Sequence, residues 1–524
     1  MVPSGLRSFP VIALLLLVAC APSAPVAPTG GAAPAAATQR AENQRLTVGY
    51  GGIWSTLDPT TINIQRAYEI FETLVWADPT GKNTEPLLAT SWTLVNPTTW
   101  EFKLRPNSRW HNGELVTAND VKWTFDHYTN PALRSPIATR IPLYQEAQVV
   151  DPATVRLITK QPDPVFLRAV MDVPILPSGY YERVGPGEFR TAPIGSGPWR
   201  LKEFRAEDRV VLVPFEGHPT RKPILTELTI RAIPELSARV AGLRTGELDL
   251  IIDIAPDQAE TLRREGLELV STPIGQIWGF WMDSVIEGSP TMDRRVRLAI
   301  NYAIDREAIV RNIYRGFQAV ADGQVVSRET FGYNPSLRSY PYDPRRAREL
   351  LAEAGYPNGF KTQMSARMQV ATTQSLIQFV QANLKDIGID AEIVSIPPGT
   401  GVLDRFIGTV AREPLFFIEI VTRPAMDASF AYTWFLSTNP GSNGMGTKHH
   451  NNPRFDEVFR QAQVEMDRAK REQLLQQLGQ ILYDDPAYVP ILAFNMITAN
   501  RPEVRGIVFR VTDQPNYDAA FRVK

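Results

Sequence analysis

The sequence predicts an α/β protein with more than one lobe, on two observations. The chain has 524 residues, 44% apolar and 21% charged, which is an ordinary globular balance over a length that one hydrophobic core does not serve. Its second half contains a strand–helix–strand pattern: Lys361–Val370 alternates in character, Thr373–Ile387 has apolar residues at helical spacing, and Ile389–Ile396 is extended after Gly388. A helical crossover of that length predicts two parallel strands.

The amino terminus differs from the rest of the chain. Arg7 gives a short positive region, and Val11–Ala19 is an unbroken apolar run that leads into Cys20. This run is too short to span a bilayer as a helix, and it resembles a bacterial lipoprotein signal peptide with its lipobox. We therefore assign residues 1–20 to a signal peptide and expect Cys20 to carry a lipid anchor. The alternative is an ordinary secretory signal that happens to contain this cysteine.

Residues 21–44 are predicted to form a flexible tether. From Ala21 to Thr38 every residue except Val26 is Ala, Pro, Gly, Ser or Thr, so the segment has almost nothing large to bury. Cys20 is the only cysteine, and the folded part can therefore form no internal disulfide. Its stability outside the cytoplasm must come from packing.

The charge balance does not indicate a particular binding partner. The chain carries 55 basic and 56 acidic residues for a formal net charge of -1, so it has no large single-sign field for nucleic acid or for an anionic membrane. No nucleic acid partner is expected.

Caps and apolar stripes predict further elements. Leu46–Tyr50 is predicted to form a strand. Asp343 caps a helix that begins at Pro344, and Asp305 caps one that runs to Gly316. Another stripe precedes extended chain and consists of Leu474, Leu475, Leu478, Ile481 and Leu482. These faces are core and not sites.

Six segments, in chain order, carry a family resemblance. They are Phe71–Leu74, Pro86–Ala89 with Trp92, Thr99–Phe125, Pro193–Leu201, Arg295–Ile309 and Tyr342–Tyr356. Together they resemble the family 5 extracellular solute-binding proteins, a group that includes oligopeptide, dipeptide and nickel binders. The resemblance covers nearly all of the chain after the tether.

The resemblance implies a two-lobe, periplasmic-binding-protein-like α/β fold with mixed sheets. Lobe I would comprise residues 45–282 and 498–524, enlarged by an extra subdomain at about 76–190, and lobe II residues 283–497. It also implies the substrate-binding lipoprotein of an ABC importer, which captures a short peptide or similar solute by closing its lobes and delivers it to permease subunits. We expect an extracytoplasmic, membrane-anchored monomer without a cofactor, periplasmic if the organism is Gram-negative.

Arg367 is the predicted carboxylate anchor. It lies near the carboxyl end of the strand at Lys361–Val370, where open α/β sheets gather ligands. Its planar guanidinium fits a carboxylate, and the resemblance to dipeptide binders implies an arginine there. The alternative is a surface charge.

The resemblance also implies an acidic anchor for an ammonium group, on a Trp-x-x-Asp pattern. The segment Phe416–Trp434 departs from this pattern, because it lacks the tryptophan and has Pro424 at the first acidic position. Asp427 matches the second acidic position, and Glu419 is a possible substitute. The departure leaves an opine, a blocked peptide, a sugar or another small molecule open beside an ordinary peptide.

Aromatic residues are the third group of candidates. Alternation along a strand places Trp278 and Phe280 on one face and Trp281 on the other. We expect Trp278, Trp281 or Trp434 to contact the solute, since flat rings give contact area at low entropic cost. Core packing is the alternative for any single ring.

Metal binding, catalysis and sensing are the alternatives to solute transport. His449 and His450 raise the question of nickel, but adjacent histidines on a strand point to opposite faces, so we expect no dedicated metal site. An enzyme is not expected because the sequence has no zinc-helix, nucleophile-elbow or phosphate-loop motif, although a carboxylate pair for glycoside hydrolysis stays open. A sensor built on the same two lobes is the third.

Overall fold

The computed structural model describes residues 40–52, 54–61, 69–368, 371–397, 413–422, 425–437, 449–512 and 515–524. The predicted signal peptide with Cys20, the predicted tether up to residue 39, and Pro424 lie outside these ranges. Residues Arg40–Lys524 form one compact unit. No helix in the described ranges has the length and apolar character needed to cross a bilayer.

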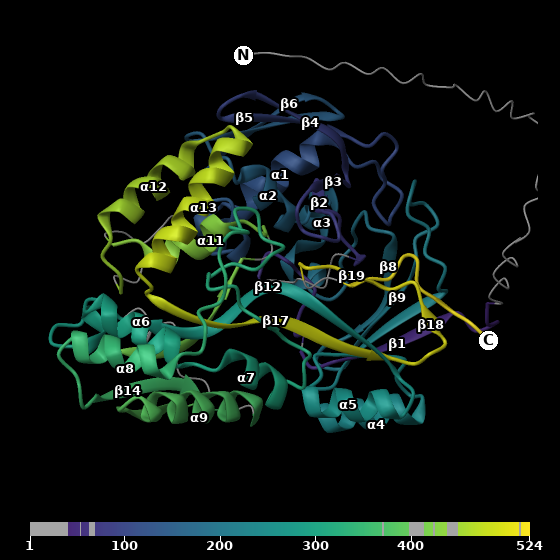
Figure 1. The fold of residues 1–524 in the computed structure, drawn as a ribbon. Helices are drawn as coiled ribbons and strands as arrows, with labels where there is room; N and C mark the ends of the chain where they lie inside the picture. Colours follow the sequence, from purple (N-terminus) through teal and green to yellow (C-terminus); the bar gives the residue numbers. More distant parts are fainter. Residues whose placement is uncertain are drawn as a thin grey trace, which may run out of the picture. The chain divides into compact units, whose positions relative to one another are not determined.

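A mixed sheet of eleven strands runs through this unit (Figure 1). In spatial order its strands are β15 (Ile389–Ile396), β14 (Phe360–Arg367), β16 (Leu415–Val421), β12 (Glu268–Met282), β17 (Tyr488–Asn500), β11 (Leu250–Ile252), β1 (Arg45–Tyr50), β10 (Glu227–Ala232), β9 (Arg209–Pro214) and β8 (Trp199–Arg205), with β13 (Ala319–Val320) beside β17. The pairs β14–β15, β14–β16, β1–β10 and β1–β11 are parallel, and the other pairs are antiparallel. The predicted α/β class with mixed sheets is confirmed.

Strands β12 and β17 carry the chain from one half of the sheet to the other. From Gln276 onward β12 pairs with β16, while its earlier residues pair with β17 alone. At its far end β17 pairs with β11 through Thr498–Asn500. These two long strands are therefore shared by the β14–β16 half and the β1–β11 half.

Helices cover both faces of the β14–β16 half (Figure 1). One face packs on α6 (Arg294–Ala303), α7 (Arg306–Asn312), α8 (Pro344–Glu353) and α9 (Ala371–Asp386), and the other on α11 (Ala428–Tyr432), α12 (Pro453–Val464) and α13 (Arg468–Asp484). Phe280 belongs to the first core, against which Trp278 also packs, and Trp281 belongs to the second. The predicted alternation of these three rings is confirmed.

The strand–helix–strand prediction also holds. Strands β14 and β15 pair in parallel across α9, and Gly388 ends the helix in the left-handed region at φ 94°. Asp343 caps α8 by accepting from the backbone N–H of Arg346. Asp305 caps α7 as predicted, but this helix ends at Asn312 rather than at Gly316. Arg315 has φ 54°, and a left-handed residue there does not continue a right-handed helix.

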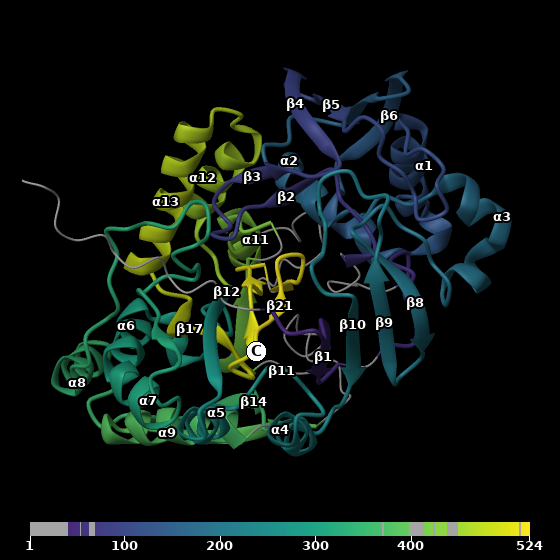
Figure 2. The same cartoon turned by 90° about the vertical axis from the view of Figure 1, so that its right-hand side faces the viewer.

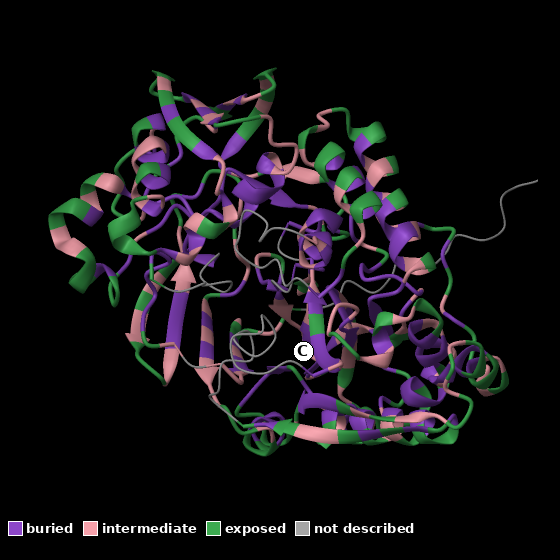
Figure 3. Ribbon diagram, turned by 90° about the vertical axis from the view of Figure 1, so that its left-hand side faces the viewer, coloured by how far each residue is buried: buried purple, intermediate pink, exposed green. Residues whose placement is uncertain are grey.

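The other half of the sheet carries α4 (Leu236–Thr245) and α5 (Pro256–Arg264), and a separate antiparallel sheet lies beyond it (Figure 2). The order of that second sheet is β4 (Ala89–Asn96), β5 (Thr99–Leu104), β7 (Thr154–Thr159) and β6 (Tyr144–Asp151). Beside it lie β2 (Val75–Ala77), β3 (Thr84–Pro86), α1 (Ala118–Tyr128), α2 (Phe166–Ala169) and α3 (Ser178–Phe189). One apolar core joins these elements to β1 and β8–β10, and Figure 3 shows buried residues along both sheets. Short pairs β18 (Val504–Arg505) with β21 (Phe521–Arg522) and β19 (Val508–Phe509) with β20 (Pro515–Asn516) complete the carboxyl terminus.

The turn in the segment Pro193–Leu201 explains why that segment is glycine-rich. A Cβ on Gly195 would lie 1.9 Å from the carbonyl oxygen of Ile70, and one on Gly197 would lie 2.3 Å from that of Glu69. The backbone N–H of Gly197 donates to Ile70 at 2.9 Å. Only glycine allows two backbones to approach so closely.

Candidate functional site

The carboxyl ends of parallel strands from both halves of the sheet point toward one stretch of β12. On one side β11 ends at Ile252, which pairs with Thr498, itself opposite Val270 of β12. On the other side β16 ends at Val421, which pairs with Gln276 of β12. Ligands of open α/β sheets collect outside the carboxyl ends of strands. We call Ser271–Gln276, together with the strand ends that point toward it, the crossing site.

The crossing site contains an irregularity in β12. The pairing register with β17 shifts between Pro273 and Gln276. Gly275 has φ 63°, and its carbonyl oxygen accepts from the backbone N–H of Thr422 at 2.9 Å. A Cβ on Gly275 would lie 2.8 Å from the sulfur of Met426, which is fully buried. The bulge therefore needs a glycine and sits directly against the segment that carries Asp427.

The predicted anchors Arg367 and Glu419 belong to opposite faces of the sheet. Arg367 is exposed at the carboxyl end of β14, in register with Ile396, whose side chain lies in the α11–α13 core. Glu419 is exposed on β16 directly opposite Trp278, which packs on the α6–α9 core. The pleat alternates side chains across a sheet, so the register does not bring these two charges together.

Asp427 is neutralised by an internal partner. Its side chain is fully buried and forms a bidentate salt bridge with Arg471, with N–O distances of 2.7 and 2.8 Å. Its Oδ1 also caps α11 by accepting from the backbone N–H of Ser429 at 3.0 Å. Burial opposes the charged form, but the neighbouring Arg471 outweighs it and holds the pKa of Asp427 below its usual range. Both carboxylate oxygens already have partners.

The three predicted tryptophans differ in their surroundings. Trp278 is half-buried, stacks on Phe494 at 4.5 Å and donates from Nε1 to Gln276 in the crossing site. Trp281 is only 1% exposed and stacks on Phe435 at 4.3 Å, so a solute would reach its ring only after neighbouring side chains moved. Trp434 is half-buried and packs against the same core as Trp281. Trp278 is the ring that the fold places nearest the crossing site.

Two small cavities flank the Asp427–Arg471 pair. One of about 150 Å³ is bordered by Trp100, Leu167 and Phe331, and one of about 110 Å³ by Asp163 and Phe430. A larger cavity of about 740 Å³ lies between α5 and α7 and is lined by none of the predicted site residues. Size alone would favour that larger cavity, but strand topology favours the crossing site.

Comparison with known proteins decides the family. The profile described as "Bacterial extracellular solute-binding proteins, family 5 Middle" matches residues 83–448. The glutathione-binding protein GsiB of Escherichia coli K12 is 28% identical over 475 residues, covering 88% of this chain and 91% of the relative. This chain belongs to family 5 of the bacterial extracellular solute-binding proteins.

Solved structures of other ABC-transporter binding proteins share the fold. The substrate-binding protein CtaP of Listeria monocytogenes aligns with a TM-score of 0.82 at 20% identity, covering 92% of this chain and all of that one. The periplasmic binding protein DppA of Helicobacter pylori, solved with the peptide STSA, aligns with a TM-score of 0.74 at 23% identity over 93% of this chain and 99% of that one. This chain therefore has the two-lobe fold of those structures. Its membership of family 5 makes it an extracytoplasmic binding protein that works with ABC permease subunits. It is a transport protein and not an enzyme.

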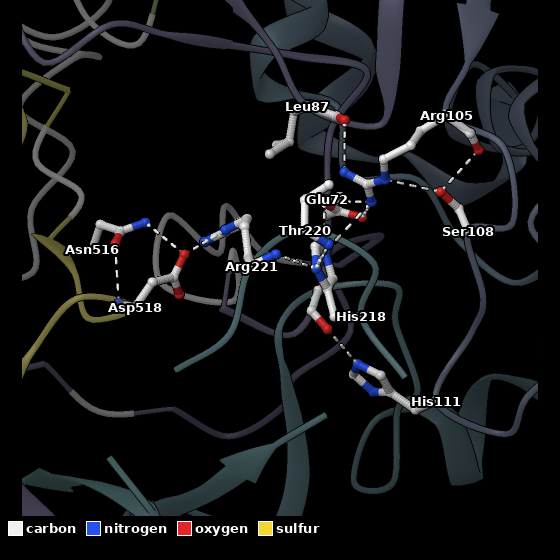
Figure 4. A network of polar contacts seen from close by, with 11 residues as sticks. Glu72, Leu87, Arg105, Ser108, His111, His218, Thr220, Arg221, Asn516 and Asp518 are labelled. Carbon is white, nitrogen blue, oxygen red and sulfur yellow. Dashed lines mark hydrogen bonds and ion pairs between the residues drawn. The ribbon is translucent and has the colours of Figure 1, made fainter. Parts of the chain in front are cut away.

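Two histidines, His111 and His218, hydrogen-bond within the folded core. His111 accepts from the backbone N–H of Gly195 at Nδ1, so its Nε2 donates to the carbonyl of Gly197 at 3.0 Å and braces that turn. Burial lowers the pKa of His111 to about 4. His218 contacts the buried carboxylate of Glu72 at 3.2 Å, beside Arg105 (Figure 4). Within the described ranges no group of three or more His, Cys, Asp or Glu side chains is arranged to hold a metal ion.

Three buried residues of this region, Arg168, Arg471 and Met426, are not evident as functional residues from the sequence. Arg168 is 7% exposed and reaches the segment that carries Asp427 across 257 positions of sequence. Arg471 is 3% exposed, on the buried face of a helix that the sequence marks only by its apolar stripe. A buried arginine in an apolar stripe is the one available signal, since such a side chain is almost always paired.

Proposed function

We propose that this family 5 protein closes two lobes around a short peptide or similar small solute at the crossing site. The observation that carries the proposal is the convergence of parallel strand ends from both halves of the sheet on Ser271–Gln276 of β12. A solute held there touches both halves, and its differential affinity stabilises the closed form. That closed form is what the permease subunits would recognise.

The two crossing strands act as the hinge in this proposal. Lobe I contains residues 45–282 and 498–524, with the extra subdomain at about 76–190, and lobe II contains residues 283–497. The bulge at Gly275 supports a bending point inside β12, ahead of the boundary at Met282, because unpaired residues with unusual dihedrals absorb rotation most readily.

The solute is proposed to bear a carboxylate and to need no free ammonium group. Arg367 is an exposed guanidinium at a strand end, suited to a carboxylate. Asp427, the expected ammonium anchor, has both oxygens bonded to Arg471 and has no exposed surface. A blocked or modified peptide, or an opine, fits this arrangement better than an ordinary free-amino peptide. Because GsiB is named as a glutathione-binding protein, glutathione belongs in any ligand screen.

A thermal-shift and tryptophan-fluorescence screen tests the proposal. The panel holds glutathione, dipeptides and tripeptides with free or acetylated amino ends, opines, sugars and nickel. A true solute at 100 times its Kd stabilises the folded protein by about 2.7 kcal/mol. Trp278 lies in β12 beside the bulge, so binding is also expected to change the fluorescence.

Arg367→Ala serves as the site variant in that screen, with Arg345→Ala as its matched control. Arg345 is 81% exposed on α8 and pairs with Glu349 of its own helix. Loss of a charge-assisted contact should weaken binding of a carboxylate solute by at least tenfold in Arg367→Ala alone. Equal affinity in both variants would remove Arg367 from the site, and no response to any carboxylate solute would refute the proposed solute class.

The membrane anchor is the remaining part of the proposal. A lipid on Cys20 and a tether through residue 39 would hold a monomeric binding unit at the membrane, periplasmic if the organism is Gram-negative. The last predicted tether residues, 40–44, instead belong to the compact unit, where Ala41 and Gln44 donate to the carbonyl of Arg522. A sensor would use the same two lobes without transport. Permease and ATPase genes beside this one would favour import.

A further inference from the structure

Arg168 connects two segments that are distant in the sequence. Its Nε donates to the carbonyl of Ala425 at 2.5 Å, and its Nη2 donates to the carbonyls of Gly81 and Met426. Its Nη1 donates to the carbonyl of Lys82 at 3.2 Å. One buried guanidinium thus ties the turn between β2 and β3 to the segment just before Asp427.

The four acceptors of Arg168 within the described residues are backbone carbonyls. When such a contact opens, each carbonyl oxygen can accept a hydrogen bond from water instead. No buried carboxylate is left without its partner. A buried ion pair would instead cost several kcal/mol to separate, as holds for Asp427 and Arg471. The chemistry of the Arg168 contact therefore suits repeated making and breaking.

The charges around Arg168 partly oppose its contact. Burial lowers the pKa of Arg168 to about 10, and the nearby guanidiniums of Arg468 and Arg471 add to this effect against the attraction of Asp427. Both of those arginines also lie over the ring of Phe331, at 5.0 and 5.5 Å. Repulsion from these two guanidiniums opposes the contact. Arg468, which is exposed, also donates from Nη2 to the carbonyl of Lys82 at 3.2 Å and so adds a second, weaker tie to the same turn.

Packing beside the contact is incomplete. The cavity of about 150 Å³ is lined by Leu94, Trp100 and Leu167 on one side and by Phe331, Met466 and Arg468 on the other. This cavity is open to solvent, so the side chains that border it make fewer contacts across the interface than those of a continuous core would. An interface with such gaps resists separation less than a continuous core does.

We propose that Arg168 is a strap that holds the β2–β3 turn against the Ala425–Met426 segment and sets how far the solute-free protein opens. The proposal rests on the proposed two-lobe closure, since the strap joins the extra subdomain to lobe II next to the crossing site. Arg168 acts here as a positioning residue and touches no solute. Releasing it shifts the balance toward the open form and gives solute freer access.

Distance measurements between two spin labels test the strap without any solute. Val95 on β4 and Val464 at the end of α12 are each 50% exposed and belong to the two sides of the contact. The parent protein is a Cys20→Ala chain with Val95→Cys and Val464→Cys, since Cys20 is the only native cysteine. The test variant is Arg168→Ala. The control is Arg156→Ala, which removes a half-exposed arginine paired with Glu101 in the same sheet region.

The strap predicts a longer and broader label distance in Arg168→Ala than in the parent, and an unchanged distance in Arg156→Ala. Loss of one or two hydrogen bonds from a charged donor corresponds to about a tenfold or greater change in the ratio of closed to open protein. Arg168→Lys keeps the charge but not the fork, so it should also lengthen the distance, and it replaces Arg168→Ala if that variant does not fold. A distance in both Arg168 variants equal to that in Arg156→Ala would overturn the strap. Since no solute is added, this result is independent of the ligand screen.

Discussion

Removing the Asp427 side chain should lower the stability of the folded protein, because Asp427 is a buried structural residue. Asp427→Ala leaves Arg471, which is 3% exposed, as a buried charge without its bidentate partner. Breaking one partner of such a pair costs about 3–5 kcal/mol. Unfolding entropy of about 2.1 cal/mol/K per residue sums to about 1 kcal/mol/K over Arg40–Lys524, so the melting temperature should fall by about 3–5 °C if this unit unfolds cooperatively.

Scanning calorimetry with a second and a third variant tests this reasoning. Asp427→Leu combined with Arg471→Met removes both charges and should recover most of the lost stability. Glu457→Ala breaks a pair with Arg460 whose two side chains are 51% and 66% exposed, and should cost less than about 1 kcal/mol. If Asp427→Ala melts within 1 °C of Glu457→Ala, the buried pair does not hold this segment as described.

The Asp427 effect should also depend on pH. The pKa of Asp427 is lowered in the folded protein, so its stabilising contribution is present above the unfolded pKa of about 3.9 and is lost as the pH falls through the folded value. The difference in melting temperature between the parent and Asp427→Ala should therefore shrink only below about pH 4. A difference that vanished near pH 6 would assign the effect to another group.

Three further predictions concern other parts of the chain. Gly197→Ala should lower the free energy of unfolding in urea by about 1–3 kcal/mol, because its Cβ would meet the carbonyl of Glu69. Gly187→Ala is the control and should not lower it, since Gly187 has open space around it. Equal costs in the two variants would contradict the close approach at Gly197. Burial, assisted by Asp518, raises the pKa of Glu69 to about 8, so this group's contribution is present at acidic pH and is lost as the pH rises toward 8. Glu69→Gln should therefore gain stability over the parent by up to about 1.4 kcal/mol per pH unit between roughly pH 5 and 8, and a pH-independent difference would show that Glu69 stays ionised. Cys20→Ala should move the protein from the membrane fraction to the soluble fraction, and continued membrane retention would refute the lipid anchor.

The sequence predicted the elements whose causes are local. Apolar spacing and Gly388 gave the strand–helix–strand unit, and the structure ends β15 at Ile396 as expected. Asp343 and Pro344 marked the start of α8, because a cap satisfies the N–H groups of its own first turn. The predicted end of α7 at Gly316 was wrong, since the helix ends at Asn312. The left-handed backbone at Arg315, which prevents the helix from reaching Gly316, leaves no mark in the apolar pattern.

The sequence by itself determined the α/β class, the alternation of the rings on β12 and, through six ordered segments, the family. Tertiary structure decided the site. It placed Arg367 and Glu419 on opposite faces, paired Asp427 with Arg471, and brought Arg168 to Ala425. Helix and strand periods depend on residues a few positions apart, which a sequence displays directly. Strand register and buried charge pairs depend on which distant segments meet, and that is fixed only when the whole core packs.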